Sequence, residues 1–354
     1  MSGGPVLVTG GAGFIGQHVA VMLASEHELV AVDSLNAQVH QHAEAAVQRF
    51  PGQVVIADVS QASTWDALPG FDVVVHLAAE TGTAQSMYEA ERYRAVNVEG
   101  TRLAAAAAAS WGAALVALSS RAVYGEGRYE CRRHGTRLGG RCCPQAEAAP
   151  SREEDPHRPV SVYGETKSEA EAILAEYAAA IPVTVLRPQN VVGFGQALHN
   201  PYTGVLAAFL ARLREGRPLS VYGDGSATRD FVHVDDVARL ITWCIDHPGR
   251  LGSLRVLNCG TGERTSLTDL ARFAAAAAPV ASAPVEYVDV GRAGDIEHAV
   301  ASLEGLRSAG APLPLMSSEQ AVADFIGRSW GLPGADSEAW DVALRELRQR
   351  GLTS

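Results

Sequence analysis

The sequence predicts an α/β fold in which a doubly wound parallel sheet carries a smaller C-terminal, substrate-binding lobe. Two observations lead to this prediction. Short apolar strands alternate with longer helical stretches through the first half of the chain, and a glycine-rich turn directly follows the first strand. Such alternation places helices on both faces of a parallel sheet. Ligands then bind beyond the carboxyl ends of the strands.

Six short apolar runs are the expected strands, at 6–9, 29–32, 54–57, 73–77, 114–119 and 183–186. Helices are expected near 14–25, 90–111 and 163–180. The second of these contains an unbroken alanine run, and alanine has the highest intrinsic helix propensity. Later in the chain, 203–215 and 235–245 read as helices and 254–258 as a strand.

The composition argues against several classes of partner. The net charge of −11 disfavours nucleic acid, and the chain has no run of 18 or more apolar residues that would span a membrane. The first strand begins too early to leave room for a signal peptide, and the five unevenly placed cysteines suit a reducing compartment. We therefore expect a cytoplasmic protein that acts on a small molecule.

The turn after the first strand has glycines in the spacing G-x-x-G-x-x-G and consists of Gly10, Gly13, Phe14, Ile15 and Gly16, with two further residues. Without side chains, the backbone can turn tightly and approach a pyrophosphate, whose charge meets the amides of the following helix. Asp33 ends the second strand, where it can bind the ribose hydroxyls and repel a 2′-phosphate. The sequence therefore predicts a Rossmann-type domain that binds NAD rather than NADP.

Asp58 and Val59 follow the third expected strand and belong to the same predicted cofactor site. The Asp58 carboxylate suits a contact with the adenine amino group. It suits the cap of the following helix equally well.

This domain is expected to span 1–188, with part of 230–259 returning to it, and 189–354 should form mainly the smaller lobe. Residues 126–160 are rich in Gly, Arg, Cys and Pro, and we expect them to form an inserted surface loop.

Tyr163 and Lys167 stand four residues apart in an expected helix, so their side chains share one face. A neighbouring cation favours the deprotonated form of an acid. We therefore expect the pKa of Tyr163 to fall from about 10 towards neutrality. The resulting phenolate is a general base for a sugar or alcohol hydroxyl.

These motifs, in this order and spacing, resemble the extended short-chain dehydrogenase/reductase family over roughly residues 5–300, and within it the nucleotide-sugar epimerases. Further matching motifs are His76-Leu77-Ala78-Ala79, Asn97 in a Val-Asn-Val-Glu-Gly-Thr run, Ser119-Ser120 with the five residues after it, Arg187-Pro188-Gln189-Asn190, 229–236 and 258–262. The runs 33–40, 85–89 and 200–204, together with the cysteine-bearing insertion, look like the dTDP-L-rhamnose 4-epimerase branch.

The resemblance implies a tightly held NAD that is reduced and reoxidised within one turnover, with Leu77, Ala78, Ala79 and Asn97 among its contacts. It also implies a catalytic triad. Tyr163 takes the C4 hydroxyl proton while hydride leaves C4, and Ser120 shares a hydrogen bond with the reacting oxygen. Lys167 lowers the tyrosine pKa and binds the nicotinamide ribose. The 4-keto sugar then turns over, and hydride returns to its opposite face.

The two residues after Ser120 separate sister reactions of this family. The 4,6-dehydratases place an Asp-Glu pair there, and decarboxylating relatives carry Glu at the second position. This chain has Arg121 and Ala122 instead. The missing acids favour plain epimerisation.

The resemblance assigns contacts with the nucleotide diphosphate to Asn190, Arg229 and Arg292, and arginine's planar donor fork suits phosphate oxygens. Gln85, Ser86 and Tyr202 are candidate sugar contacts. For these three, core or loop roles are equally plausible.

The insertion contains Cys131, His134, Cys142 and Cys143, which could offer zinc three thiolates and one imidazole. Structural zinc normally uses two spaced chelating pairs, and adjacent cysteines chelate one ion poorly. Similar proteins carry fuller cysteine pairs here. We expect an unmetallated loop, with zinc as the alternative.

The leading hypothesis is an NAD-dependent 4-epimerase of a nucleotide-diphosphate sugar, with a dTDP-6-deoxyhexose such as dTDP-L-rhamnose as the nearest substrate. The alternatives are a UDP-glucose or UDP-glucuronate 4-epimerase, an NAD(P)-dependent ketosugar reductase, and a regulatory protein that binds NAD(P) without catalysis. Asp33 disfavours the reductase, and the complete triad disfavours the regulatory protein. The helices at 90–111 and 163–180 resemble those of a four-helix dimer interface, which implies a homodimer.

Overall fold

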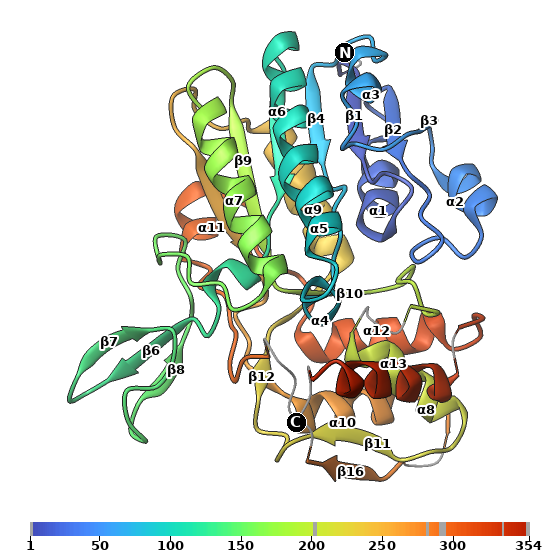
Figure 1. The fold of residues 1–354 in the computed structure, drawn as a ribbon, viewed down its shortest axis with the longest axis vertical. Helices are drawn as coiled ribbons and strands as arrows, with labels where there is room; N and C mark the ends of the chain where they lie inside the picture. Colours follow the sequence, from blue (N-terminus) through green and yellow to red (C-terminus); the bar gives the residue numbers. More distant parts are fainter. Residues whose placement is uncertain (1–2, 201–203, 281–282, 290–294, 335, 352–354) are drawn as a thin grey trace.

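The computed structural model describes residues 3–200, 204–280, 283–289, 295–334 and 336–351. Its centre is a seven-stranded parallel sheet with the order β14-β9-β5-β4-β1-β2-β3 (Figure 1). The strands are β1 (Val6–Thr9), β2 (Leu29–Asp33), β3 (Gln53–Ile56), β4 (Val73–His76), β5 (Ala114–Leu118), β9 (Val183–Pro188) and β14 (Arg255–Cys259). The chain order reverses between β1 and β4, which is where ligands bind in such sheets. The predicted fold class is confirmed.

Helices cover both faces of this sheet. One face packs against α1 (Phe14–Leu23), α9 (Val234–Asp246) and α11 (Glu304–Ala309), and the other against α3 (Ala62–Asp66), α6 (Gly100–Trp111) and α7 (Val162–Tyr177). Figure 1 shows α6 and α7 in front of the sheet. Along β1, Val6 and Val8 pack into the core on the α1 and α9 face, and Leu7 packs into the core on the α6 and α7 face. Alternate side chains of a strand point to opposite faces, so a strand buried on both sides must be apolar throughout.

The expected strands all occur within two residues of their predicted bounds, but two other segments differ from expectation. The helix expected at 90–111 is divided into α5 (Ala90–Arg94), a π-helical segment (Ala95–Glu99) and α6. The expected loop at 126–160 contains an antiparallel sheet of the order β7-β6-β8. Its strands are β6 (Arg128–Cys131), β7 (Gly135–Leu138) and β8 (Glu147–Ala149). We call it the inserted sheet; it protrudes from the body of the protein in Figure 1.

A second, smaller core lies below the carboxyl ends of the central strands. It is built from α8 (Val205–Arg214), α10 (Leu267–Ala277), α12 (Ser318–Ser329) and α13 (Ser337–Gln349), with the parallel pair β11 (Leu219–Tyr222) and β16 (Val285–Val288). Two more short pairs join it: β10 (Asn190–Val192) with β13 (Phe231–His233), and β12 (Thr228–Arg229) with β15 (Thr265–Ser266). The remaining short helices of the described residues are α2 (Ala43–Arg49), α4 (Thr83–Ser86) and a 3₁₀ turn (Arg121–Tyr124).

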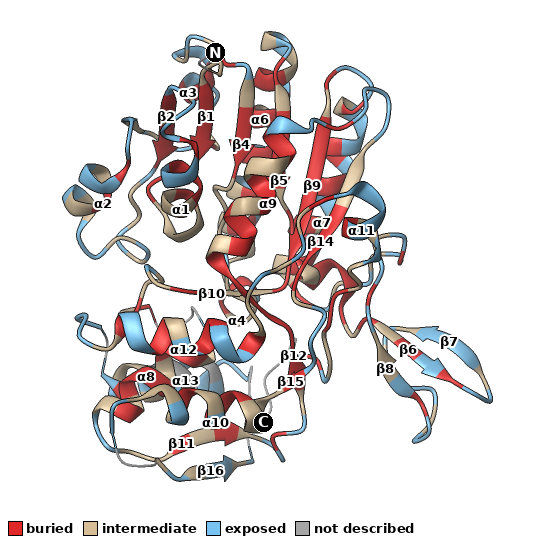
Figure 2. Cartoon of the chain, turned by 180° about the vertical axis from the view of Figure 1, so that it is seen from behind, coloured by how far each residue is buried: buried red, intermediate tan, exposed pale blue. Residues whose placement is uncertain are grey.

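Burial follows this architecture (Figure 2), with the central strands buried and much of the inserted sheet exposed. Among the described residues, no helix is both long enough and apolar enough to cross a bilayer.

Candidate active site

A cleft of about 1880 Å³ lies between the carboxyl edge of the central sheet and the smaller lobe. Most of the predicted site residues line it: Gly10, Gly13, Phe14, Ile15, Gly16, Asp33, Asp58, Val59, Leu77, Ala78, Ala79, Gln85, Tyr163, Asn190 and Arg229. Ser86, Asn97, Ser120 and Lys167 are buried beside this lining rather than part of it. Tyr202 and Arg292 lie outside the described residues.

The glycine turn forms a cradle that side chains would fill. Gly10 has a φ of +66°, and a Cβ at Gly16 would lie 2.4 Å from the carbonyl oxygen of Gly10. The following helix α1 begins at Phe14, and no side chain caps its first turn. The free amides of that turn suit an anion such as a pyrophosphate. The cradle therefore fits the dinucleotide that the sequence predicts.

Asp33 is buried at the end of β2, next to the glycine turn. Its Oδ2 accepts a hydrogen bond from the Ala12 amide at 3.1 Å, and its Oδ1 accepts one from the Leu35 amide at 2.9 Å. His40 Nε2 lies 3.2 Å from Oδ1, a partner that the sequence analysis missed. These contacts hold the carboxylate at the cleft, as a ribose contact requires. The role itself stays a prediction.

Asp58 is exposed, and its Oδ1 accepts hydrogen bonds from both the amide and the hydroxyl of Ser60 at 2.8 Å. The carboxylate therefore closes the turn that leads into α3. The N-cap of α3 is Gln61, whose side chain makes no capping hydrogen bond, so Asp58 is not the cap of this helix. The contact with adenine stays a prediction.

Asn97 lies in the π-helical segment and holds the backbone after β4. Its Oδ1 accepts from the Glu80 amide at 2.9 Å, and its Nδ2 donates to the Glu80 carbonyl and the Thr166 hydroxyl, both at 3.1 Å. π-helical turns are frequent at functional sites. Here the turn brings one amide side chain between the exit of β4 and α7, so Asn97 positions the cleft wall.

Tyr163 lines the cleft, and Ser120 is buried beside it. The Ser120 hydroxyl lies near enough to the Tyr163 phenol to favour its deprotonated form, and it accepts a hydrogen bond from the Ala122 amide at 3.1 Å. Two predicted members of the triad are therefore brought together, although they come from different elements. A hydroxyl at this place can stabilise charge that develops on a reacting oxygen.

The start of α7 places the phenol. Ser161 caps this helix by accepting a hydrogen bond from the Gly164 amide at 3.2 Å. The Ser86 hydroxyl accepts from the Tyr163 amide at 3.0 Å and donates to the Thr83 carbonyl at 2.6 Å. Gln85 is likewise engaged, in reciprocal amide bonds with Gln38 at 2.8 and 3.1 Å. The sugar contacts predicted for Ser86 and Gln85 stay predictions.

The pKa of Tyr163 is raised rather than lowered. Burial of the phenol dominates this shift, while the Ser120 hydroxyl and the positive charge of Arg121 act in the opposite direction. Our prediction that Lys167 would bring this pKa towards neutrality is wrong for this structure. The Lys167 ammonium donates instead to the carbonyl of Leu118 at 2.9 Å. The cation that acts on the phenol is Arg121.

Lys167 belongs to a buried polar network that the sequence analysis missed. Burial lowers the pKa of Lys167 to about 8, and Glu171, one turn further along α7, acts against this shift. Burial alone would raise the pKa of Glu171, but hydrogen bonds from His157 and Arg187 lower it to about 2. Arg187 donates to Glu171 at 2.9 and 2.7 Å. Glu171 stands four residues after Lys167 in the sequence, a helical spacing that could have indicated this network.

Arg229 projects from the smaller lobe into the same cleft. It is buried and donates to three backbone carbonyls, those of Thr228, Ile296 and Glu297, at 2.9, 2.7 and 3.1 Å. Burial and the neighbouring charge of Arg229 lower the pKa of Arg121 to about 10. The two guanidinium groups therefore lie near each other, with the Asp295 carboxylate 3.2 Å from Arg229. A pair of guanidinium groups suits a diphosphate.

Comparisons with known proteins agree with this geometry. Residues 6–260 match the model of the NAD dependent epimerase/dehydratase family. The chain is 40% identical to a dTDP-L-rhamnose 4-epimerase of Burkholderia thailandensis over 327 residues, which cover 86% of this chain and 88% of that protein. It is 33% identical to a UDP-glucose 4-epimerase of Mycolicibacterium smegmatis over 270 residues, 75% of this chain and 79% of that one.

Among solved structures, the fold is similar to that of a Thermus thermophilus UDP-glucose 4-epimerase in complex with NAD. The TM-score is 0.76 at 27% identity, and the match covers 93% of this chain and 100% of the other. A Thermotoga maritima UDP-glucose 4-epimerase with UDP-glucose gives a TM-score of 0.77 at 26% identity, over 92% and 98% of the two chains.

Proposed function

The chain belongs to the NAD dependent epimerase/dehydratase family, and we propose that it inverts C4 of a nucleotide-diphosphate sugar through a transient 4-keto intermediate. The proposed cofactor is a tightly held NAD. The observation that carries the proposal is that Tyr163, with Ser120 acting on its phenol, lines the same cleft as the glycine cradle. A dTDP-6-deoxyhexose such as dTDP-L-rhamnose is the proposed substrate, supported by the relative at 40% identity.

In the proposed reaction, Tyr163 removes the proton of the C4 hydroxyl as the C4 hydride departs, and later returns that proton to the reduced oxygen. Ser120 hydrogen-bonds the same oxygen as its charge changes. NAD, when bound, supplies the acceptor and donor of the hydride. Arg121 favours the phenolate form of Tyr163 by its positive charge.

The cleft wall behind Ser120 supports epimerisation over water elimination. Arg121, which lines the cleft, and the buried Ala122 occupy the two positions where dehydratases of the family carry acids. An acid that could protonate a leaving hydroxyl is thus replaced by a cation at the first position and by a methyl group at the second.

Purified enzyme incubated with dTDP-L-rhamnose, UDP-glucose and UDP-glucuronate tests this proposal, with products separated by ion exchange and identified by NMR. We expect dTDP-L-rhamnose to equilibrate with its C4 epimer without net change in NAD. Conversion of a UDP-sugar alone would favour the second candidate, a UDP-glucose or UDP-glucuronate 4-epimerase, which the relative at 33% identity supports. Unchanged sugars would refute both epimerase activities. Stoichiometric consumption of NADPH with a 4-keto sugar nucleotide would then indicate a ketosugar reductase.

We also propose that the enzyme is a cytoplasmic homodimer. The support is the resemblance of α5, α6 and α7 to helices that form a four-helix interface in this family. Light scattering coupled to gel filtration should give twice the chain mass of 37.2 kDa. A single chain mass at micromolar protein would contradict the dimer.

A further inference from the structure

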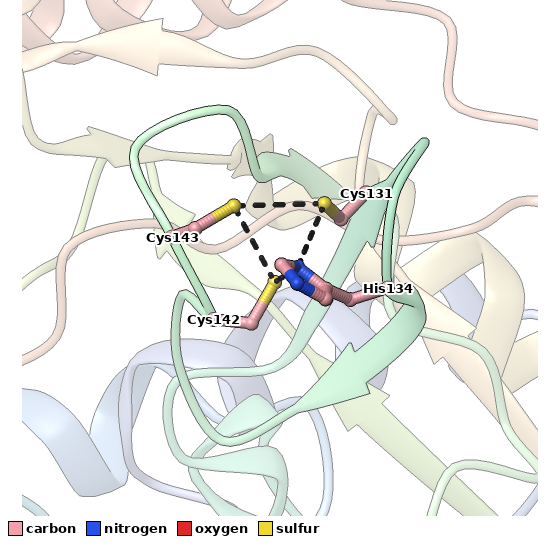
Figure 3. Close-up of side chains that lie close together, drawn as sticks. All are labelled: Cys131, His134, Cys142 and Cys143. Atoms are coloured by element: carbon pink, nitrogen blue, oxygen red, sulfur yellow. Dashed lines mark hydrogen bonds between the residues drawn. The ribbon is translucent and has the colours of Figure 1, made fainter.

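Four potential metal ligands converge in the inserted sheet. Cys131 ends β6, His134 lies in the turn before β7, and Cys142 and Cys143 precede β8. Figure 3 shows the four side chains pointing toward one another. Their sulfur atoms and the histidine ring nitrogen all lie within 4.8 Å of one another.

Four of the six distances between the ligand atoms are close to the edges of a tetrahedron around an ion, and all six are within 4.8 Å. Cys143 Sγ lies 3.6 Å from Cys131 Sγ and 3.9 Å from Cys142 Sγ. His134 Nδ1 lies 3.5 Å from Cys131 Sγ and 3.4 Å from Cys142 Sγ. Tetrahedral zinc, with bonds of about 2.3 Å to sulfur and about 2.0 Å to nitrogen, separates its ligands by about 3.8 Å (S···S) and about 3.5 Å (S···N). A disulfide would need about 2.05 Å.

The first two ligands lie on one tight turn between β6 and β7. Gly135 follows at a φ of +69°, the left-handed conformation that lets the chain turn back into β7.

The inserted sheet has too little apolar core to account for its own order. Its buried side chains are those of Tyr129, Cys131 and Ala146, with Cys143 and Ala148 partly buried against them. Units of fewer than about 40 residues usually need a disulfide or a metal ion to fold stably. Two members of this small core belong to the ligand cluster itself.

We propose that Cys131, His134, Cys142 and Cys143 bind one structural zinc ion. Because protein atoms fill all four positions, the site is closed to substrate and stabilises the fold. This replaces our expectation of an unmetallated loop. Cys142 and Cys143 can bind one ion although they are adjacent, since their sulfur atoms are already separated by 3.9 Å, about the length of a tetrahedral edge.

The ion would also fix Arg141 against Glu297 and His298, next to the backbone that Arg229 contacts. Arg141, directly before Cys142, donates to Glu297 Oε2 at 3.1 Å and to His298 Nε2 at 2.9 Å. The Glu297 carbonyl accepts from Arg229 at 3.1 Å. Resting on the proposed function, we infer that loss of zinc raises the KM for the nucleotide sugar and leaves NAD content unchanged.

Metal analysis by mass spectrometry of untagged protein, purified without chelators, tests the site independently of activity. We expect one zinc per chain in the wild type and a large loss in Cys131→Ser and Cys142→Ser. The matched control is Cys244→Ala, which removes a buried cysteine of α9 outside the cluster and should keep its zinc.

Cobalt substitution tests the same site in the wild-type protein. The result therefore does not depend on whether the cysteine variants fold. Chelation followed by addition of Co²⁺ should produce the absorption of a tetrahedral, thiolate-bound ion. Wild-type protein that contains no zinc and takes up no Co²⁺ would overturn the proposal. An intact protein mass that is lower by two hydrogens would indicate a disulfide in the cluster instead. Reduction should then restore the two hydrogens and make both thiols available for alkylation.

Discussion

The Lys167 ammonium lies 2.9 Å from the carbonyl oxygen of Leu118, the last residue of β5, and donates a hydrogen bond to it. The charge that acts on Tyr163 comes instead from Arg121, and the Ser120 hydroxyl acts in the same direction. Spacing along a helix places Tyr163 and Lys167 on one face, but a lysine side chain can reach in several directions from there. This arrangement makes Arg121 a residue that tunes the proposed base.

Replacing Tyr163 by phenylalanine should lower kcat by about 10²- to 10⁴-fold, because the proton acceptor is lost. The NAD content of the purified variant should stay near that of the wild type, since the ring still packs edge-on to Tyr93 at 6.4 Å. Tyr93→Phe is the control. It removes the neighbouring hydroxyl, which donates to the carbonyls of Thr81 and Gly82, and should retain most of the activity. Equal losses in the two variants would contradict the assignment of Tyr163.

Replacing Arg121 by glutamine should raise the pKa of Tyr163, because the cation favours the phenolate. The base is active when deprotonated, so the rate falls as the pH drops through its pKa. A higher pKa therefore moves the acidic limb of the kcat profile to higher pH. Arg272→Gln, an exposed change on α10, should leave the limb in place. An unmoved limb in Arg121→Gln would show that this guanidinium does not act on the base.

Glu171→Gln should destabilise the protein in a pH-dependent way. The folded pKa of Glu171 is lowered to about 2. The stabilisation is therefore complete above the unfolded pKa of about 4.3 and is lost as the pH falls towards 2. At pH 7 we expect a loss of roughly 3–5 kcal/mol in the free energy of unfolding, since Arg187 is left without its buried partner.

Urea unfolding at pH 7 and at about pH 3 measures this effect, and the difference between wild type and Glu171→Gln should shrink at the lower pH. The control is Glu165→Gln on the same helix, because this carboxylate is 48% exposed and pairs only loosely with Arg94 at 3.6 Å. Its effect should stay within about 0.5 kcal/mol. A Glu171→Gln difference that is equal at both pH values would contradict the pKa assignment.

Asp33→Ser should weaken NAD binding by about 10- to 100-fold, the cost of losing hydrogen bonds to a charged group. It should also narrow the preference for NAD over NADP, because the carboxylate no longer repels a 2′-phosphate. Titration calorimetry with both cofactors gives the two affinities. Asp58→Ser provides the comparison: an equal loss there would support the contact with adenine, and an unchanged affinity would leave Asp58 as a residue of the turn before α3.

Much of this molecule was predictable because it depends on neighbours along the chain. Strand and helix positions follow from apolar periodicity, and the glycine cradle follows from the close approach at Gly10 and Gly16. The helix at Tyr163 begins where Ser161 can cap it. Division of the helix at 90–111 was not predicted, since nothing local distinguishes the turn around Asn97.

The sequence by itself determined the parallel sheet, the cofactor turn and the identity of the hydroxyl groups at the site. Only the tertiary structure decided where the long charged side chains end: Lys167 at Leu118, His40 at Asp33, and Arg121 beside Tyr163. It also decided that Cys142 and Cys143 lie close to Cys131 and His134, which stand at least eight residues earlier in the chain. The physical reason is shared. Such contacts join segments that are distant in sequence through side chains with several rotatable bonds, so burial and partner geometry select the outcome and local spacing does not.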